Sequence, residues 1–178
     1  MAEYTPQNAR VEVLTFKEGL LSPVAHDLLI RVQRFEITLD GGRVEADIDL
    51  SSLIVTCARK NGEDEPGTLS DADKEKIRNT IQTDVLHTHR YPEAHFEADL
   101  NDLDEGQLEG ELELHGETND VRARVEEIGG DVRVSVEVHQ PDFNVTPYTA
   151  MFGTLRVRAD VIIQVTFIGC TLDELRAN

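Results

Sequence analysis

Apolar and polar residues alternate along most of this chain, and the longest alternating run covers residues 155–167. Its apolar members are Leu155, Val157, Ala159, Val161, Ile163, Val165 and Phe167. Successive side chains of a β-strand point to opposite faces, so the run predicts one long strand with an apolar face and a wet face. A chain built mainly of such strands must bury its apolar faces against one another. The pattern therefore predicts a closed barrel or a sandwich.

Shorter alternating runs predict the remaining strands. They cover residues 10–16, 28–39, 44–50, 53–57, 94–100, 106–115, 120–126, 131–139 and 142–145. The alternation slips by one residue inside 28–39, where a β-bulge is expected. Asp40-Gly41-Gly42 separates two alternating runs and predicts a tight hairpin. Glutamates at alternate positions of 109–113 and arginines at alternate positions of 122–124 predict a second hairpin over 107–126, because opposite charges favour neighbouring strands.

One segment has helical rather than strand periodicity. Ser70 is a good N-cap, acidic residues follow it in the first turn, and Ile77 and Ile81 lie four positions apart. The sequence therefore predicts one α-helix over about residues 70–84, packed outside the barrel or across one end of it. No repeat or linker interrupts the pattern, so residues 1–178 are expected to form a single domain.

The charge of the chain limits its partners. Lys and Arg total 17 against 35 Asp and Glu, a formal net charge of -18. Such a surface repels nucleic acids and anionic lipid headgroups. No segment is apolar enough to span a membrane, and residues 1–20 do not resemble a secretory signal. As written, the sequence predicts a cytoplasmic protein, or a periplasmic one if a leader has been trimmed. Cys57 and Cys170 are expected to be free thiols.

Histidines supply the main candidates for chemistry. His87 and His89 would point the same way on an extended segment, and with His95 they could bind a metal. The alternative is a polar connection with solvent-exposed histidines. His26 and Asp27 are adjacent, so they would diverge on a strand, and no nucleophile motif accompanies them. The expected function is therefore not enzymatic, and the alternative is a metal-binding protein or metal-dependent enzyme using the three histidines.

Four segments match a known pattern in the same order. Residues 84–96 contain Tyr91-Pro92 and a phenylalanine four residues after the proline, and 110–118 end in Leu-x-Leu-His-Gly-x-Thr. Residues 48–53 read Ile-Asp-Leu-Ser-Ser-Leu, and 141–145 read Pro-Asp-Phe-Asn-Val. Together these segments resemble the YceI-like family of lipocalin-like polyisoprenoid-binding proteins over residues 41–167. The chain departs from the family pattern before its first long strand and between residues 56 and 86, near the expected mouth of the barrel.

The resemblance implies an all-β fold: a lipocalin-like, extended antiparallel barrel of about eight strands with one helix. It also implies an apolar small-molecule ligand, such as an isoprenoid or a fatty-acid-like lipid, held in the interior without catalysis or another cofactor. Alternation selects the candidate lining residues Phe16, Phe35, Val55, Phe96, Leu112, Phe143, Val157 and Val161. A core filled entirely by side chains is the alternative.

Two further features predict contacts at the surface. Tyr148, Met151 and Phe152 form an apolar loop, and Phe152 is added to the ligand-binding candidates as part of a lid. Folding of this loop back over the barrel end is the alternative. Ile162 is the one apolar residue on the wet face of 155–167, so an external contact is expected there. That contact would be with the helix or with a second subunit, as in a homodimer.

Overall fold

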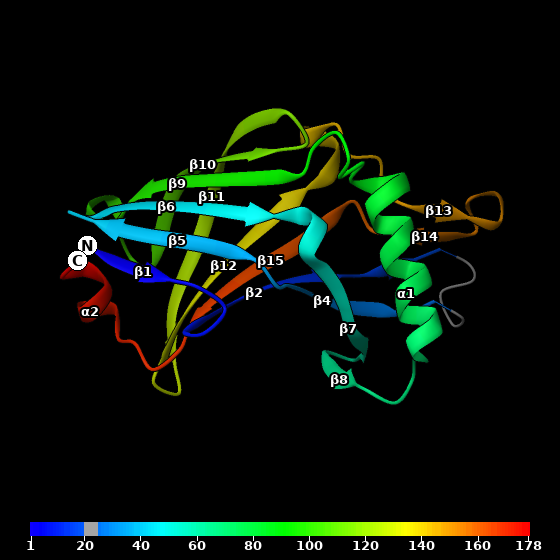
Figure 1. The fold of residues 1–178 in the computed structure, drawn as a ribbon, viewed down its shortest axis with the longest axis horizontal. Helices are drawn as coiled ribbons and strands as arrows, with labels where there is room; N and C mark the ends of the chain where they lie inside the picture. Colours follow the sequence, from blue (N-terminus) through cyan, green and yellow to red (C-terminus); the bar gives the residue numbers. More distant parts are fainter. Residues whose placement is uncertain (20–24) are drawn as a thin grey trace.

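Antiparallel pairing organises nearly the whole molecule (Figure 1). The structure is a computed structural model that describes residues 1–19 and 25–178, without the side chain of Met151. Three neighbouring strands, β5 (Phe35–Asp40), β6 (Arg43–Asp49) and β9 (Glu93–Asp99), run along the longest axis of the molecule (Figure 1). Helix α1 (Asp71–Thr80) lies at one end of that axis, and the short helix α2 (Leu172–Arg176) lies at the other with both chain termini (Figure 1).

Twelve strands of the described residues form one sheet, and three form a smaller one. The order in the large sheet is β1 (Ala2–Tyr4), β5 (Phe35–Asp40), β6 (Arg43–Asp49), β9 (Glu93–Asp99), β10 (Gln107–Leu114), β11 (Glu117–Ile128), β12 (Asp131–His139), β15 (Asp160–Phe167), β2 (Ala9–Thr15), β4 (Asp27–Val32), β7 (Leu53–Lys60) and β8 (Glu63–Glu65). The small sheet contains β13 (Thr149–Ala150), β14 (Leu155–Val157) and β3 (Lys17–Glu18).

The fold is the expected antiparallel, lipocalin-like type, but two details of the prediction were wrong. The hydrogen-bonded order runs from β1 to β8 without returning to its start, so the barrel is not closed by strand pairing. The strand number also exceeds eight, partly because two long segments bend and each supplies two strands. β4 continues into β5, and β6 continues into β7. At these bends the two parts of the barrel wall are joined by the covalent chain and not by hydrogen bonds between strands.

Ser52 holds the two bends together. Its Oγ accepts hydrogen bonds from the backbone N–H of Gln33 at 3.1 Å and of Arg34 at 2.9 Å, and donates to the Asp49 carbonyl at 2.7 Å. Gln33 and Arg34 lie between β4 and β5, whereas Ser52 lies between β6 and β7. The serine hydroxyl thus replaces ladder bonds that the strands lose where they bend.

The predicted bulged strand over 28–39 is therefore two strands. The inward faces of β4 and β5 are out of phase because two residues, Gln33 and Arg34, separate them. A register shift does occur nearby, but on β7: Leu29 pairs with Cys57 and Ile30 pairs with Val55. The slip in the alternation within 28–39 therefore marks the break between β4 and β5, and not a bulge within one strand.

The predicted strand over 155–167 also divides into two. β14 joins the small sheet and β15 joins the large one, with a break at Arg158 and Ala159. Gln140, a buried residue, accounts for the break. Its side-chain amide donates to the Arg158 carbonyl at 3.0 Å, and its backbone N–H donates to the Ala159 carbonyl at 2.9 Å. The alternation of inward residues continues through the break nevertheless.

Other local predictions are confirmed. Ser70 and Asp73 form a reciprocal capping box at the start of α1, which continues as a π-helical turn over Ile81–Val85. Gly41 and Gly42, both with positive φ, make the two-residue turn between β5 and β6. In the β10–β11 hairpin, Arg122 bonds Glu109 across the strands at 2.7 Å. The strand predicted over 142–145 was wrong, because Gln140–Phe143 form a 3-10 turn with Pro141 among its first residues.

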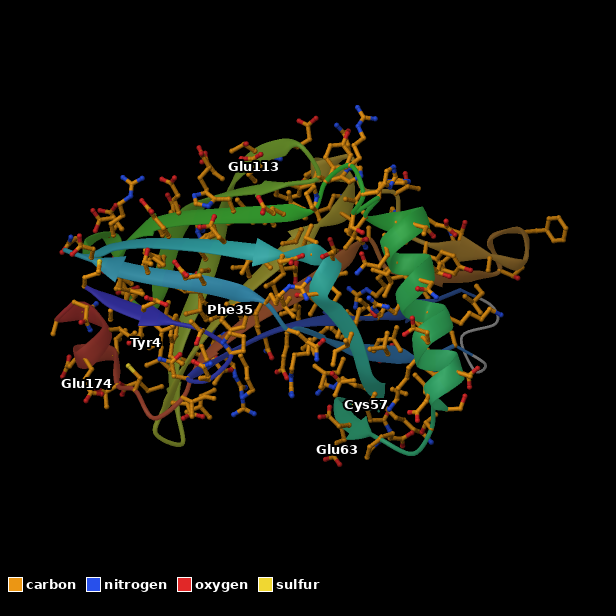
Figure 2. The ribbon with its side chains drawn as sticks, in the orientation of Figure 1. Tyr4, Phe35, Cys57, Glu63, Glu113 and Glu174 are labelled. Carbon is orange, nitrogen blue, oxygen red and sulfur yellow. The ribbon has the colours of Figure 1, made fainter. Side chains whose placement is uncertain are left out.

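Side chains fill the end of the barrel that carries the termini. Tyr4 packs edge-on against Phe167, with ring centroids 4.8 Å apart, and lies near α2 (Figure 2). Its hydroxyl lies 3.6 Å from the Cys170 sulfur, and Leu175 of α2 is buried beside them. Burial and this contact raise the pKa of Tyr4 to about 12, so the phenol stays protonated. This region is called the packed end below.

Ser52→Ala should destabilise the protein by about 1–2 kcal/mol, because the Arg34 backbone N–H loses its bond to the hydroxyl and the Gln33 N–H keeps only the Ser52 carbonyl. Urea denaturation followed by circular dichroism measures the change. Ser51→Ala, which removes only the solvent-exposed hydrogen bonds of a neighbouring hydroxyl to Asp49 and Arg34, is the control and should destabilise the protein less than Ser52→Ala does. Equal effects of the two substitutions would show that the hydroxyl of Ser52 does not hold the bend.

Candidate ligand-binding cavity

The other half of the barrel is hollow. A cavity of about 710 Å³ lies between the packed end and α1. That volume falls within the range of about 300–1,000 Å³ usual for small-molecule sites. Its walls come from β2, β4, β6, β9, β10, β11, β12 and β15, and its far side from α1 and the small sheet.

Height along each strand decides whether an inward residue fills the core or faces the cavity. On β12, Val132 is fully buried in the packed end, whereas Val134, Val136 and Val138 line the cavity. On β15, Phe167 is packed against Tyr4, whereas Val161 and its inward neighbours line the cavity. The same alternating series thus provides core at one end and wall at the other.

Phe96 marks the boundary between the two halves. It faces the cavity from β9 and lies over Gly110 of β10. A Cβ added at Gly110 would lie 2.6 Å from two atoms of the Phe96 ring, so the glycine makes room for the aromatic side chain. Ala98, the next inward residue of β9, no longer reaches the cavity. The Phe96 ring therefore forms part of the cavity floor.

Helix α1 lies across the cavity, as one of the two predicted arrangements had it. Ile77 lines it from the helix, Ile81 and Val85 line it from the π-helical turn, and Leu86 lines it directly after that turn. Side chains attach this segment to the bend between β6 and β7. Arg78 donates to the Leu53 carbonyl at 3.0 Å, and Gln82 donates to the Leu50 carbonyl at 2.9 Å. The apolar stripe of the helix is thus directed at the cavity.

Polar groups gather only toward the α1 end of the lining. They come from α1, from the residues before it, from the small sheet and from the adjoining strand ends. The polar and charged lining residues are Thr15, Lys17, His26, Thr68, Asp73, Lys76, Thr80, Gln140, Tyr148 and Arg156. Asp73, Lys76 and Arg156 are also solvent-exposed, so the cavity reaches the surface here. This region is called the mouth. Sequence reasoning anticipated only Tyr148 here and missed the charged residues, because no local pattern marks them.

The nine residues predicted to contact ligand separate into groups. Phe96, Leu112, Val157 and Val161 line the cavity. Phe35, Val55 and Phe143 are buried in the surrounding core and do not reach it. Phe16 and Phe152 also lie outside the lining, and the Phe152 ring is completely exposed. Of the predicted lid, Tyr148 alone lines the cavity, and the side chain of Met151 lies outside the described structure.

Ile162 makes its outward contact within the chain. Strand pairing places Ile162, Leu14, Leu29 and Cys57 side by side on four neighbouring strands. These residues form a second apolar cluster on the outside of the sheet, with Phe16 packed against it. The guanidinium of Arg158 lies 5.5 Å from the centre of the Phe16 ring. The predicted contact of Ile162 with the helix was wrong; the contact with a second subunit stays a prediction.

The predicted metal cluster does not assemble. His95 is bonded to Asp47 at 2.7 Å and to Glu97 at 3.1 Å, on the outer face of the sheet. His89 is exposed, and His87 faces His115 instead, with a ring nitrogen separation of 3.1 Å. Among the described residues, no three His, Cys, Asp or Glu side chains gather as metal ligands would. The alternative of a three-histidine metal site was therefore wrong.

Protonation states differ among these histidines. Burial opposes a charge on His95, but the carboxylates of Asp47 and Glu97 outweigh it and raise its pKa. Burial, followed by the neighbouring His87, lowers the pKa of His115. Tyr91 packs against the His115 ring with centroids 4.2 Å apart. His115 is therefore held in its neutral form beside the segment that follows α1.

Asp27 has a structural partner rather than a catalytic one. Its carboxylate accepts a hydrogen bond from the Lys17 backbone N–H at 2.8 Å, at the start of β3.

Both cysteines are free and buried, Cys57 in the outer cluster and Cys170 beside Tyr4. None of the helices in residues 1–19 and 25–178 has the length and apolar character that a bilayer crossing requires.

Comparison with known proteins shows which family has this sequence pattern and fold. The sequence profile of the YceI-like domain matches residues 9–168. The chain belongs to the YceI-like family. No curated protein sequence matches it.

Solved structures share the fold at low sequence identity. A polyisoprenoid-binding domain from Saccharophagus degradans aligns with a TM-score of 0.55 and 13% identity, covering 93% of this chain and 96% of that one. BcnA from Burkholderia cenocepacia aligns with a TM-score of 0.55 and 16% identity, covering 89% and 94%. At these identities the YceI-like fold is shared, while the ligand must be argued from the cavity.

His115→Asn should reduce the loss of stability on acidification. Because the folded-state pKa of His115 is lowered, its contribution is present above about pH 6.5 and is lost as pH falls toward the folded pKa. Urea midpoints at about pH 7 and about pH 5 measure the loss, and asparagine tolerates the positive φ of this position. His89→Asn, at an exposed histidine, should behave like the unsubstituted protein. Identical losses in all three proteins would contradict the assignment.

Proposed function

We propose that this protein binds one apolar chain, an isoprenoid or a similar lipid, in the cavity and carries or sequesters it without catalysis. One observation supports the proposal above the others: a cavity of about 710 Å³ whose inner walls are apolar. Interiors of folded proteins are normally packed to the density of organic crystals. A hollow half beside a well-packed half is what a binding protein requires.

The chemistry of the walls favours hydrocarbon. Valine, leucine and isoleucine side chains form most of the lining below the mouth. Each methylene removed from water contributes about 0.8 kcal/mol to affinity, so a long chain binds without polar anchors. Phe96, Leu112, Val157 and Val161 are the proposed contacts among the residues predicted from alternation.

The neighbours in fold agree with this class of ligand. The domain from Saccharophagus degradans is described as polyisoprenoid-binding. Transfer of that property to this chain is part of the proposal, supported by the common family and by the cavity. A cytoplasmic location, or a periplasmic one if a leader has been trimmed, suits a carrier that keeps an apolar molecule in solution. Analytical ultracentrifugation tests whether a second subunit contacts Ile162 in a homodimer.

Denaturing extraction of the purified protein, followed by mass spectrometry, tests the proposal and identifies the ligand. A stoichiometric apolar chain should be recovered, and the delipidated protein should take up an isoprenoid alcohol such as farnesol. Recovery of no lipid, together with no uptake by the delipidated protein, would contradict the proposal. It would favour a barrel that serves only a structural role.

Val136→Phe should lower the affinity for farnesol by about tenfold or more, because the added ring occupies cavity volume and displaces buried methylenes. Titration calorimetry with delipidated protein measures the change. Glu137→Phe is the matched control: it adds the same ring at the next position of β12, which is exposed. Equal affinities in the two variants would show that the chain binds elsewhere.

Two aromatic residues near the mouth should differ in their effects. Tyr148→Ser should weaken farnesol binding by about threefold to tenfold, because Tyr148 lines the cavity. Phe152→Ser should leave the affinity unchanged, because the Phe152 ring is fully exposed. The same titration measures both. Loss of binding in Phe152→Ser alone would restore the lid that the sequence predicted.

A further inference from the structure

The mouth carries a charge opposite to that of the rest of the protein. The ionised side chains of the lining are Lys17, Lys76 and Arg156 against the single carboxylate of Asp73. Over the whole chain, acidic residues outnumber basic ones by 35 to 17. Residues 20–24, outside the described structure, contain no ionisable side chain that would alter this balance. A local excess of cations therefore interrupts an acidic surface.

Lysines are rare in this chain and concentrated at the mouth. The chain has only four lysines, and two of them, Lys17 and Lys76, line the cavity. They reach it from different elements: Lys17 from β3 and Lys76 from α1. In the β3–β14 ladder Lys17 lies opposite Val157, a lining residue, and it is partly buried. Two segments that are distant in sequence thus place ammonium groups around one mouth.

Asp73, the one carboxylate in the lining, caps the start of α1. Asp73 accepts a hydrogen bond from the Ser70 hydroxyl at 2.6 Å as part of the capping box of α1. These bonds lower the pKa of Asp73, so it remains ionised at the first turn of the helix. Glu18 lies opposite Arg156 in the β3–β14 ladder but does not line the cavity. Lys17, Lys76 and Arg156 therefore supply the positive charge that the lining offers to a ligand, and two of these three residues are lysines.

We infer that the ligand is an anionic amphiphile, with its hydrocarbon in the apolar cavity and a carboxylate or phosphate head held at the mouth by Lys17 and Lys76. This inference rests on the proposed function and specifies the head of the same ligand. An apolar wall ending in a cationic rim matches both parts of such a molecule. The acidic surface outside would disfavour the head at other positions and so orient the ligand.

Paired ligands that differ only in the head separate this inference from the proposed function. Farnesol with farnesyl phosphate tests a phosphate head, and hexadecanol with palmitate tests a carboxylate head. Delipidated protein should bind one or both anions about tenfold more tightly than the matching alcohol at low salt. Because both lysines lie near solvent, the preference should shrink to about twofold or less at high salt.

Variants assign the preference to the mouth. Lys17→Gln combined with Lys76→Gln should weaken anion binding by about fivefold to tenfold, a clearly larger loss than for the matching alcohol, so that the preference for the anion disappears. Lys60→Gln combined with Lys74→Gln is the control, because it removes the same charge from lysines outside the lining. The control should retain the preference for the anion.

The outcomes are distinct. Loss of the preference in the first double variant alone supports the inference, and preference for only one of the two anions identifies the head. Alcohols and anions that bind alike to the unsubstituted protein overturn it while leaving the proposed function intact. Equal loss in both double variants also overturns it, because the effect is then one of net charge. Failure of every ligand to bind overturns the proposed function and this inference together.

Discussion

Sheets with one apolar face must cover that face, and this protein covers it differently at the two ends of one barrel. At the packed end, Tyr4 and Phe167 meet and the terminal segments close over them. At the other end the same strands continue, but no equally bulky side chains meet in the middle, and α1 spans the space that remains. The cavity depends on this division, because the packed end supplies the stability that a hollow structure loses by forgoing core contacts.

Alternation predicted the direction of side chains better than the course of the backbone. Val157 and Val161 lie on one face across the break at Arg158, as the pattern indicated, yet the strand itself does not continue. The breaks depend on Ser52 and Gln140, which bond backbone groups about twenty residues away in sequence. Alternation depends only on residues next to one another in sequence, so it could not predict hydrogen bonds to such distant partners or the breaks that depend on them.

The candidate site was predictable in part for the same reason. Phe35 and Phe96 are both inward aromatic residues on neighbouring parts of the sheet, but only Phe96 reaches the cavity. The period of a strand gives the face of a residue and not its height along the barrel axis. Likewise His87 finds His115 rather than His89, because the chain turns at His87, which has a positive φ. Apart from Tyr148, which the sequence placed in a lid, the mouth residues carry no periodic signal and are brought together only by the fold.

The segments that depart from the family pattern supply part of the mouth, to which Gln140, Tyr148 and Arg156 also contribute. Lys17 and His26 lie before β4, and the region between residues 56 and 86 includes Asp73 and Lys76. The segments that follow the pattern supply the walls, as Phe96 and Leu112 do. This arrangement separates the property common to the fold, an apolar interior, from the property that differs in this chain, the charge at its opening.

Both termini lie at the packed end, opposite α1 (Figure 1), and the Gly41 N–H donates to the Asn178 carbonyl at 2.7 Å. Tyr4 and Glu174 mark the same end in Figure 2. A surface or a fusion partner attached through either terminus would therefore hold the molecule with its opening directed away from the attachment. The protein could be immobilised at high density in a uniform orientation, with the route for an apolar guest left free.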